Sequence, residues 1–168
     1  MITVRLALTI APLLALALAG CGSNTSGTGG GGAGGQTSTT TGSICASDPR
    51  VTSYAVGASA AAMDGKVKVT FVDAQPAPPA KGSNAWTIDL TDDAGQPIEG
   101  ATISLKPFMP DHGHGATVIP AVKPGSQAGR YVVDQIELFM PGVWQSTFTI
   151  TPSGGAPDTV VFTFCVDG

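Results

Sequence analysis

The sequence predicts an all-β fold, an immunoglobulin-like sandwich of two sheets with about seven strands, over residues 44–168. Apolar and polar residues alternate there in short runs, the period of a strand with one buried face. Turn residues interrupt these runs roughly every eight to twelve positions, a spacing typical of sandwiches. All ten aromatic residues of the chain lie in this region, and no segment of it carries a convincing helical apolar stripe.

Seven runs are the expected strands. The sixth shows the pattern: Trp144, Ser146, Phe148 and Ile150 fall on one side, which we predict to face the core. The expected strands are 66–72, 85–91, 101–108, 117–122, 129–139, 143–151 and 159–166.

Turn-forming residues connect these strands. Residues 92–97, 123–126 and 152–155 are rich in Gly, Pro and Asp, which favour turns. The prolines of residues 75–80 have no backbone N–H groups to donate to a neighbouring strand, so this run cannot form a central strand of a sheet. We expect it to be an exposed edge or a connection. Residues 58–63 are the one helical-looking piece and are expected to form a single short turn at most.

The first twenty residues have the features of a signal peptide, a basic start followed by an apolar run at 6–19 that is short for a bilayer span. The run ends in Leu-Ala-Gly before Cys21, which resembles the bacterial lipobox, where the cysteine sulfur receives a diacylglycerol. By resemblance to the sorting pattern, Gly22 and Ser23 favour the outer membrane. The alternative is an ordinary secretory peptide with a chance cysteine.

These features predict three parts: a signal peptide at 1–20, the lipidated Cys21 with a flexible tether at 21–43, and a folded domain at 44–168. Gly, Ser and Thr dominate the tether, which therefore has no side chains to build a core. We expect a lipid-anchored protein of the bacterial cell envelope that faces the periplasm or the cell surface, with the membrane as one partner.

Once Cys21 is assigned to lipid, Cys45 and Cys165 remain as a pair near the two ends of the domain. In an oxidising compartment we expect them to form a disulfide. Two free thiols, or a cysteine metal site, are the alternatives.

Both histidines lie in one loop between two expected strands. His112 and His114 are two residues apart and so project to the same side of an extended segment. Met109 lies just upstream, and Met140 joins them if its loop lies at the same end of the sandwich. Imidazole and thioether ligands together favour copper, Cu(I) above all, over zinc, calcium or magnesium.

The same loop has interpretations without a metal. Asp111 could cap a tight turn in which Gly113 and Gly115 take positive φ. Met109 and Met140 could be ordinary core residues. The two histidines could also form a pH-sensitive loop.

Five stretches resemble the YtkA-like/FixH-like family of envelope domains, over roughly residues 66–150. The resemblance implies an immunoglobulin-like fold similar to that of CopC-type copper carriers, and FixH members are linked to assembly of a copper-containing cytochrome oxidase. This chain differs from FixH in having an expected lipid anchor and tether in place of a transmembrane helix. The stretches are 86–90, 93–101, 108–115, 129–133 and 140–145, the third and last of which hold the His loop and the Met-Pro-Gly-x-Trp turn.

Other residues favour no further chemistry. Trp86 and Trp144 are expected as core anchors. Asp89, Asp92 and Asp93 lack the spacing of a calcium loop and are expected in a solvated hairpin.

The net charge of −4 argues against nucleic acid as a partner. The chain also lacks a Gly-x-Ser-x-Gly nucleophile motif, so an enzyme is not expected. The sequence thus predicts an envelope binding module with a copper site, and the alternative is a non-metal structural or interaction module that docks to an envelope protein.

Overall fold

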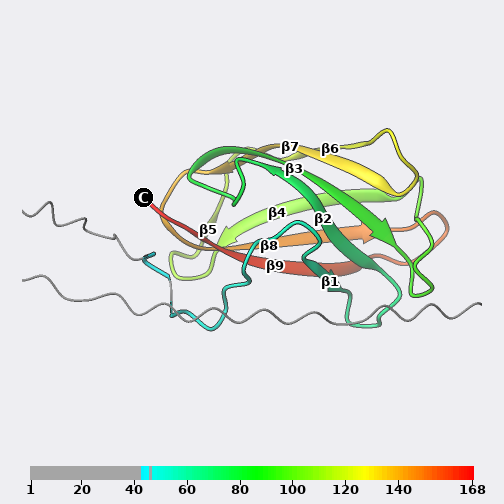
Figure 1. Ribbon diagram of the computed structural model, residues 1–168, viewed down its shortest axis with the longest axis horizontal. Coiled ribbons are helices and arrows are strands. Elements are labelled where there is room, and N and C mark those ends of the chain that lie inside the picture. The colour runs from blue at the N-terminus through cyan, green and yellow to red at the C-terminus, as the bar shows by residue number, and fades with distance from the viewer. Residues whose placement is uncertain (1–42, 46) are drawn as a thin grey trace, which may run out of the picture. The chain divides into compact units, whose positions relative to one another are not determined.

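The computed structural model describes residues 43–45 and 47–168 (Figure 1). The expected signal peptide, the lipid site at Cys21 and the tether up to residue 42 lie outside the described residues and remain predictions. No helix in the described part has the length and hydrophobicity needed to cross a membrane.

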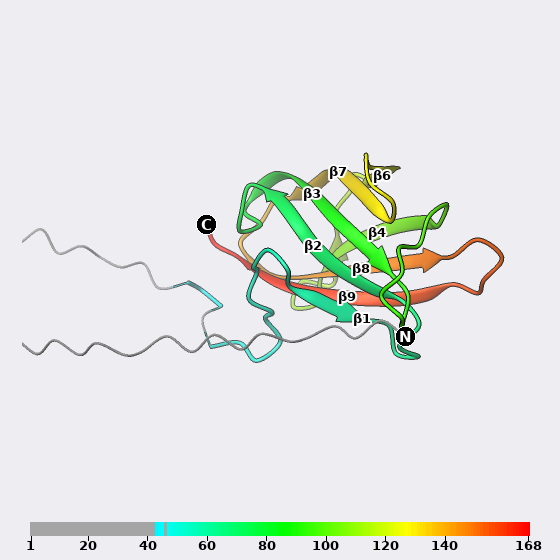
Figure 2. The same cartoon turned by 45° about the vertical axis from the view of Figure 1, so that its right-hand side comes forward.

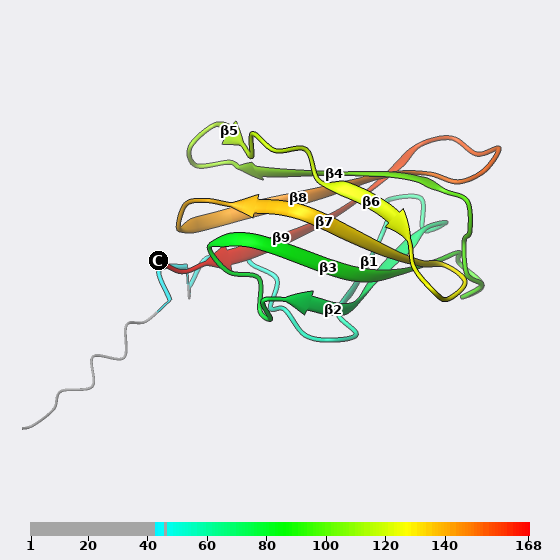
Figure 3. The same cartoon turned by 90° about the horizontal axis from the view of Figure 1, so that it is seen from above.

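Two antiparallel sheets pack face to face, which confirms the all-β sandwich (Figures 1 and 3). One sheet has the order β1-β2-β3-β7-β6 and the other has the order β5-β4-β8-β9. The strands are β1 (Ser59–Ala61), β2 (Lys68–Gln75), β3 (Gly82–Thr91), β4 (Thr102–Met109), β5 (His114–Gly115), β6 (Ala121–Pro124), β7 (Arg130–Leu138), β8 (Gly142–Thr151) and β9 (Asp158–Val166).

The core follows the alternation of the strands. On β8, Trp144, Ser146, Phe148 and Ile150 are all fully buried, as the sequence predicts. Trp86 on β3 is buried in the same core, where both tryptophans serve as anchors. The aromatic rings meet mostly edge to face, the arrangement that the ring quadrupoles favour.

Two expected elements differ in the structure. Residues 58–63 contain strand β1 in place of a helical turn, because the backbone of Ser59–Ala61 pairs with β2 and a lone helical turn is too short to be stable. The strand expected at 117–122 begins only at Ala121, after Pro120, and extends to Pro124. As an edge strand, β6 tolerates that terminal proline.

The β2–β3 and β7–β8 connections lie at one end of the sandwich, the end where the C-terminus lies (Figure 2). Strand β5, which begins at His114, lies at the same end (Figure 3). The register brings together the ends of four strands there, since Gly82 of β3 lies opposite Leu138 of β7 and Gly142 of β8 lies opposite Val166 of β9. We call this the histidine end; it carries the β4–β5 turn (110–113), the β7–β8 turn (139–141) and the proline-rich β2–β3 connection (76–81).

The expected disulfide is present at the same end. Cys45 and Cys165 are joined, with their Cα atoms 5.6 Å apart, so the segment before β1 is tied to the end of strand β9. The bond links residues separated by 120 positions in the sequence.

Replacing both cysteines (Cys45→Ala with Cys165→Ala) should lower the free energy of unfolding by about 4–5 kcal/mol, because the unfolded chain regains the entropy of a long loop. Urea denaturation of the oxidised parent and the double variant measures the difference. A loss below about 1 kcal/mol would show that the bond contributes little to this fold.

Candidate functional site

His112 lies within the tight turn between β4 and β5, and His114 is the first residue of β5. The backbone N–H groups of His112 and Gly113 both donate to the Met109 carbonyl, over 3.2 and 2.9 Å. Gly113 has a φ of +70°, a conformation that glycine adopts without strain. Gly115, in contrast, has no positive φ, and instead lies so close to β4 that a Cβ there would be 2.8 Å from the Pro107 carbonyl oxygen.

Aromatic side chains of β8 and the β7–β8 turn fix the His114 ring. It stacks on Phe139, with centroids 5.5 Å apart and planes at 18°, and lies 6.4 Å from Trp144. Its Nδ1 atom is buried and has no hydrogen-bond partner within the described part of the chain. A buried polar atom left unpaired costs about 1–3 kcal/mol, so a ligand that paired with this nitrogen would remove that cost.

The second imidazole lies beside the first. His112 is exposed, and the two ring centroids are 5.7 Å apart with planes inclined by 55°. A ring nitrogen binds a metal at about 2.0–2.1 Å, which puts the centroid about 3 Å from the ion and two such rings about 5–6 Å apart. The spacing of His112 and His114 therefore suits one shared ion.

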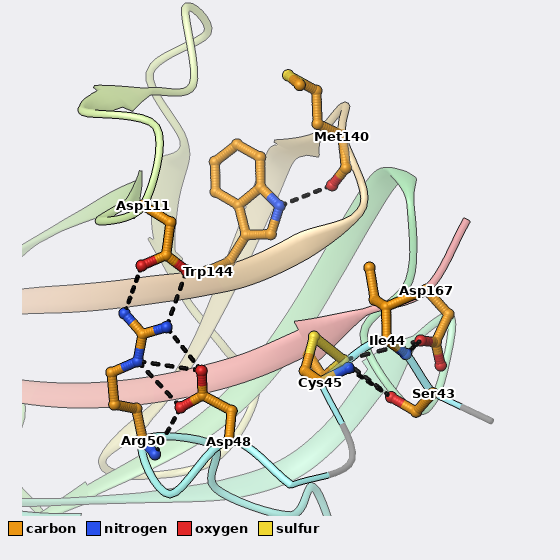
Figure 4. The surroundings of a disulfide bond; sticks show 10 residues. Ser43, Ile44, Cys45, Asp48, Arg50, Asp111, Met140, Trp144 and Asp167 are labelled. Carbon is orange, nitrogen blue, oxygen red and sulfur yellow. Dashed lines mark hydrogen bonds and ion pairs between the residues drawn. A yellow bond between two sulfur atoms is a disulfide. The ribbon is translucent and has the colours of Figure 1, made fainter.

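The two thioethers lie at different depths. Met140 is half-buried at the rim, directly after Phe139, and its carbonyl accepts a hydrogen bond of 2.9 Å from the Trp144 indole (Figure 4). Met109 has no exposed surface and is part of the core. Its Cε lies 2.6 Å from where a Cβ on Gly142 would be, so a larger residue at 142 would have to displace the end of the Met109 side chain. The φ of +136° at Gly142 itself favours glycine. Met140 is the sulfur nearer to solvent.

Asp111 does not cap the turn. Both of its carboxylate oxygens accept hydrogen bonds from Arg50, at 2.7 and 2.8 Å, and the N–H groups of the turn bond to Met109 instead. The Arg50 guanidinium lowers the pKa of the Asp111 carboxyl. Sequence analysis missed Arg50, because it lies 61 residues before Asp111 and no local motif marks it.

Other acidic groups have structural roles. Asp89 pairs with Arg130 across β3 and β7, and Asp92 accepts a hydrogen bond from the Gln96 N–H within its hairpin. Within residues 43–45 and 47–168, no three His, Cys, Asp or Glu side chains are grouped as metal ligands. The histidine end therefore offers two imidazoles and one rim thioether, a donor set suited to a soft ion.

The unpaired nitrogen gives a direct prediction. His114→Phe should leave the metal-free protein as stable as the parent, or about 1 kcal/mol more stable, because an aromatic ring stays on Phe139 while the orphaned Nδ1 is removed. Thermal unfolding of the metal-free proteins measures this, with His112→Phe at the exposed position as the control. Destabilisation by more than about 1 kcal/mol would show that Nδ1 has a stabilising partner in solution.

Comparisons place the chain among known sequences and structures. A family model described as YtkA-like matches residues 62–149. No curated protein matches the sequence.

Three solved structures are similar at low identity. A DUF4426 family protein from Pseudomonas aeruginosa is 15% identical, with a TM-score of 0.46 over 61% of this chain and 92% of that one. A copper-bound variant of FetP from uropathogenic Escherichia coli is 17% identical, with a TM-score of 0.46 over 68% of this chain and 92% of that one. CopC from Methylosinus trichosporium is 21% identical, with a TM-score of 0.40 over 59% of this chain and 93% of that one. At these TM-scores the similarities do not bear on the chemistry of the site.

Proposed function

This chain belongs to the YtkA-like family, and we propose that it is a binding module of the bacterial cell envelope that takes up Cu(I) at the histidine end. The observation that carries the proposal is the pair of imidazole rings 5.7 Å apart, one of which holds a buried nitrogen with no hydrogen-bond partner among residues 43–45 and 47–168. His112 and His114 supply the two nitrogen ligands, and Met140 supplies the sulfur.

The donor set favours Cu(I) over other ions. A thioether is a soft ligand that binds Cu(I) well and adds little affinity for calcium or magnesium. Zinc prefers four ligands drawn from imidazole, thiolate and carboxylate, and the described residues offer only the two imidazoles of that set here. Three ligands of this kind hold the ion while leaving an open side for transfer to a partner.

The ligands are held before the ion arrives. His114 is stacked on Phe139, and the backbone of Met140 is fixed by the hydrogen bond from the buried Trp144. Pre-organised ligands lose little conformational entropy on binding, which raises affinity. His112 is exposed and completes the site from the solvent side.

Cu(I) uptake tests the proposal directly. We expect His112→Ala or His114→Ala to weaken Cu(I) binding at least about tenfold, which corresponds to about 1.4 kcal/mol, because each removes a ligand. Competition against a Cu(I) chelator of known affinity measures this loss. Weak uptake that is equal in parent and variants would favour the non-metal interaction module.

Two methionine variants identify the sulfur ligand. Met140→Leu and Met109→Leu both conserve volume and should each cost less than about 1.5 kcal/mol of stability. We expect the Met140 variant alone to lose Cu(I) affinity, because Met109 lies inside the core. The same competition titration separates them, and a larger loss for Met109→Leu would assign the sulfur to Met109 instead.

Anchoring at Cys21 is part of the proposal. The disulfide supports an oxidising compartment, in keeping with export to the envelope. Gly22 and Ser23 after Cys21 make the outer membrane the favoured site. Cys21→Ala should move the protein from the membrane fraction to the soluble fraction, because the thiol that accepts the lipid is gone. Fractionation with an immunoblot measures this, and a variant that stays in the membrane fraction would show that something other than lipid holds the protein there.

A further inference from the structure

Arg50 lies between two carboxylates at the histidine end (Figure 4). Its Nη1 and Nη2 atoms donate to the two oxygens of Asp111, over 2.7 and 2.8 Å. Its Nε and Nη2 atoms also donate to Asp48, over 2.9 and 2.6 Å. A guanidinium that meets a carboxylate through two parallel hydrogen bonds fixes the direction of that carboxylate as well as balancing its charge.

The segment that carries Arg50 is attached to the sandwich on both sides. Before it, Cys45 is bonded to Cys165 of β9. After it, the Thr52 N–H donates to the Thr163 carbonyl over 2.7 Å, and Tyr54 packs edge-on against Phe71 in the core. Arg50 therefore reaches Asp111 from a fixed base.

Without this contact, Asp111 would be available to a metal. It is the residue directly before His112, and the turn that carries it is exposed. One carboxylate oxygen together with two imidazoles is a common set of zinc ligands. In the structure Asp111 instead gives both oxygens to Arg50 and does not group with the two histidines.

We propose that Arg50 is a specificity-determining residue, which holds both oxygens of Asp111 and so keeps a hard ligand away from His112 and His114. The two imidazoles and the thioether are then left to a soft ion. The proposal rests on the proposed Cu(I) function and deepens it. Arg50 lies outside residues 62–149, so the family match does not include it.

Zinc binding tests this step without copper. Titration of the full-length protein in detergent with Zn²⁺ alone should show that Arg50→Ala binds zinc about two- to fivefold more tightly than the parent, because the loss of an exposed ion pair releases Asp111 as a third ligand. Adding Asp111→Asn to that variant should remove the gain. Arg50→Lys, which keeps a cation beside Asp111, should stay close to the parent.

A second pair provides the matched control. Arg130 makes an equivalent two-point contact with Asp89, over 2.8 and 2.9 Å, away from the histidines. Arg130→Ala should leave zinc affinity unchanged, which separates release of Asp111 from the general loss of an ion pair. Arg50→Gln keeps most of the side-chain length and should give the same gain as Arg50→Ala, even if the alanine variant folds poorly.

The proposal is overturned if Arg50→Ala and Arg50→Gln bind zinc no more tightly than the parent, or if the gain persists with Asp111→Asn. These outcomes are independent of copper. A parent that fails to bind Cu(I) removes the proposed function, while a zinc gain that depends on Asp111 still shows that Arg50 withholds this carboxylate.

Discussion

The packing of the His114 ring, on strand β5, against the rings of Phe139 and Trp144 is the contact on which the histidine end depends. Trp144 is fully buried, and its indole N–H donates to the Met140 carbonyl. One core side chain therefore lies against a proposed nitrogen ligand and also fixes the backbone of the proposed sulfur ligand. Contact with the sandwich core therefore restrains the β4–β5 turn, which is otherwise held only by the pairing of the two-residue strand β5.

Order at this end comes from two different sources. Apolar packing fixes the position of His114, and it does not depend strongly on salt. The bridge from Arg50 to Asp111 is exposed, and exposed ion pairs contribute little to stability. The effect of this ion pair is to hold the Asp111 carboxylate toward Arg50 and away from the histidines. On this account the core sets the geometry of the site, and the surface bridge determines which donor atoms the site contains.

Much of this fold could be predicted from local patterns. Alternation on β8 identified the buried face from Trp144 to Ile150, because one face of a strand in a sandwich must be apolar. The disulfide followed from counting cysteines. Strand β1 could not be predicted, because Ser59–Ala61 has no strand pattern of its own and forms through backbone pairing with β2.

The site was predictable only in part. The sequence spacing predicted that His112 and His114 lie together, and their rings are 5.7 Å apart, but His112 lies in a tight turn and not in the extended segment that the prediction assumed. The sequence spacing could not predict that Met109 is buried and Met140 is only half-buried, because the burial of each side chain depends on how β4 and β8 pack. Arg50 reaches Asp111 across 61 residues, and such a contact is set by the tertiary fold alone.

X-ray absorption at the copper edge of the Cu(I)-loaded protein tests the central claim most directly, because it identifies the atoms bound to the ion. The account predicts two nitrogen scatterers with the multiple-scattering pattern of imidazole rings and one sulfur scatterer. A spectrum without imidazole scattering, or with sulfur ligands alone, would contradict it.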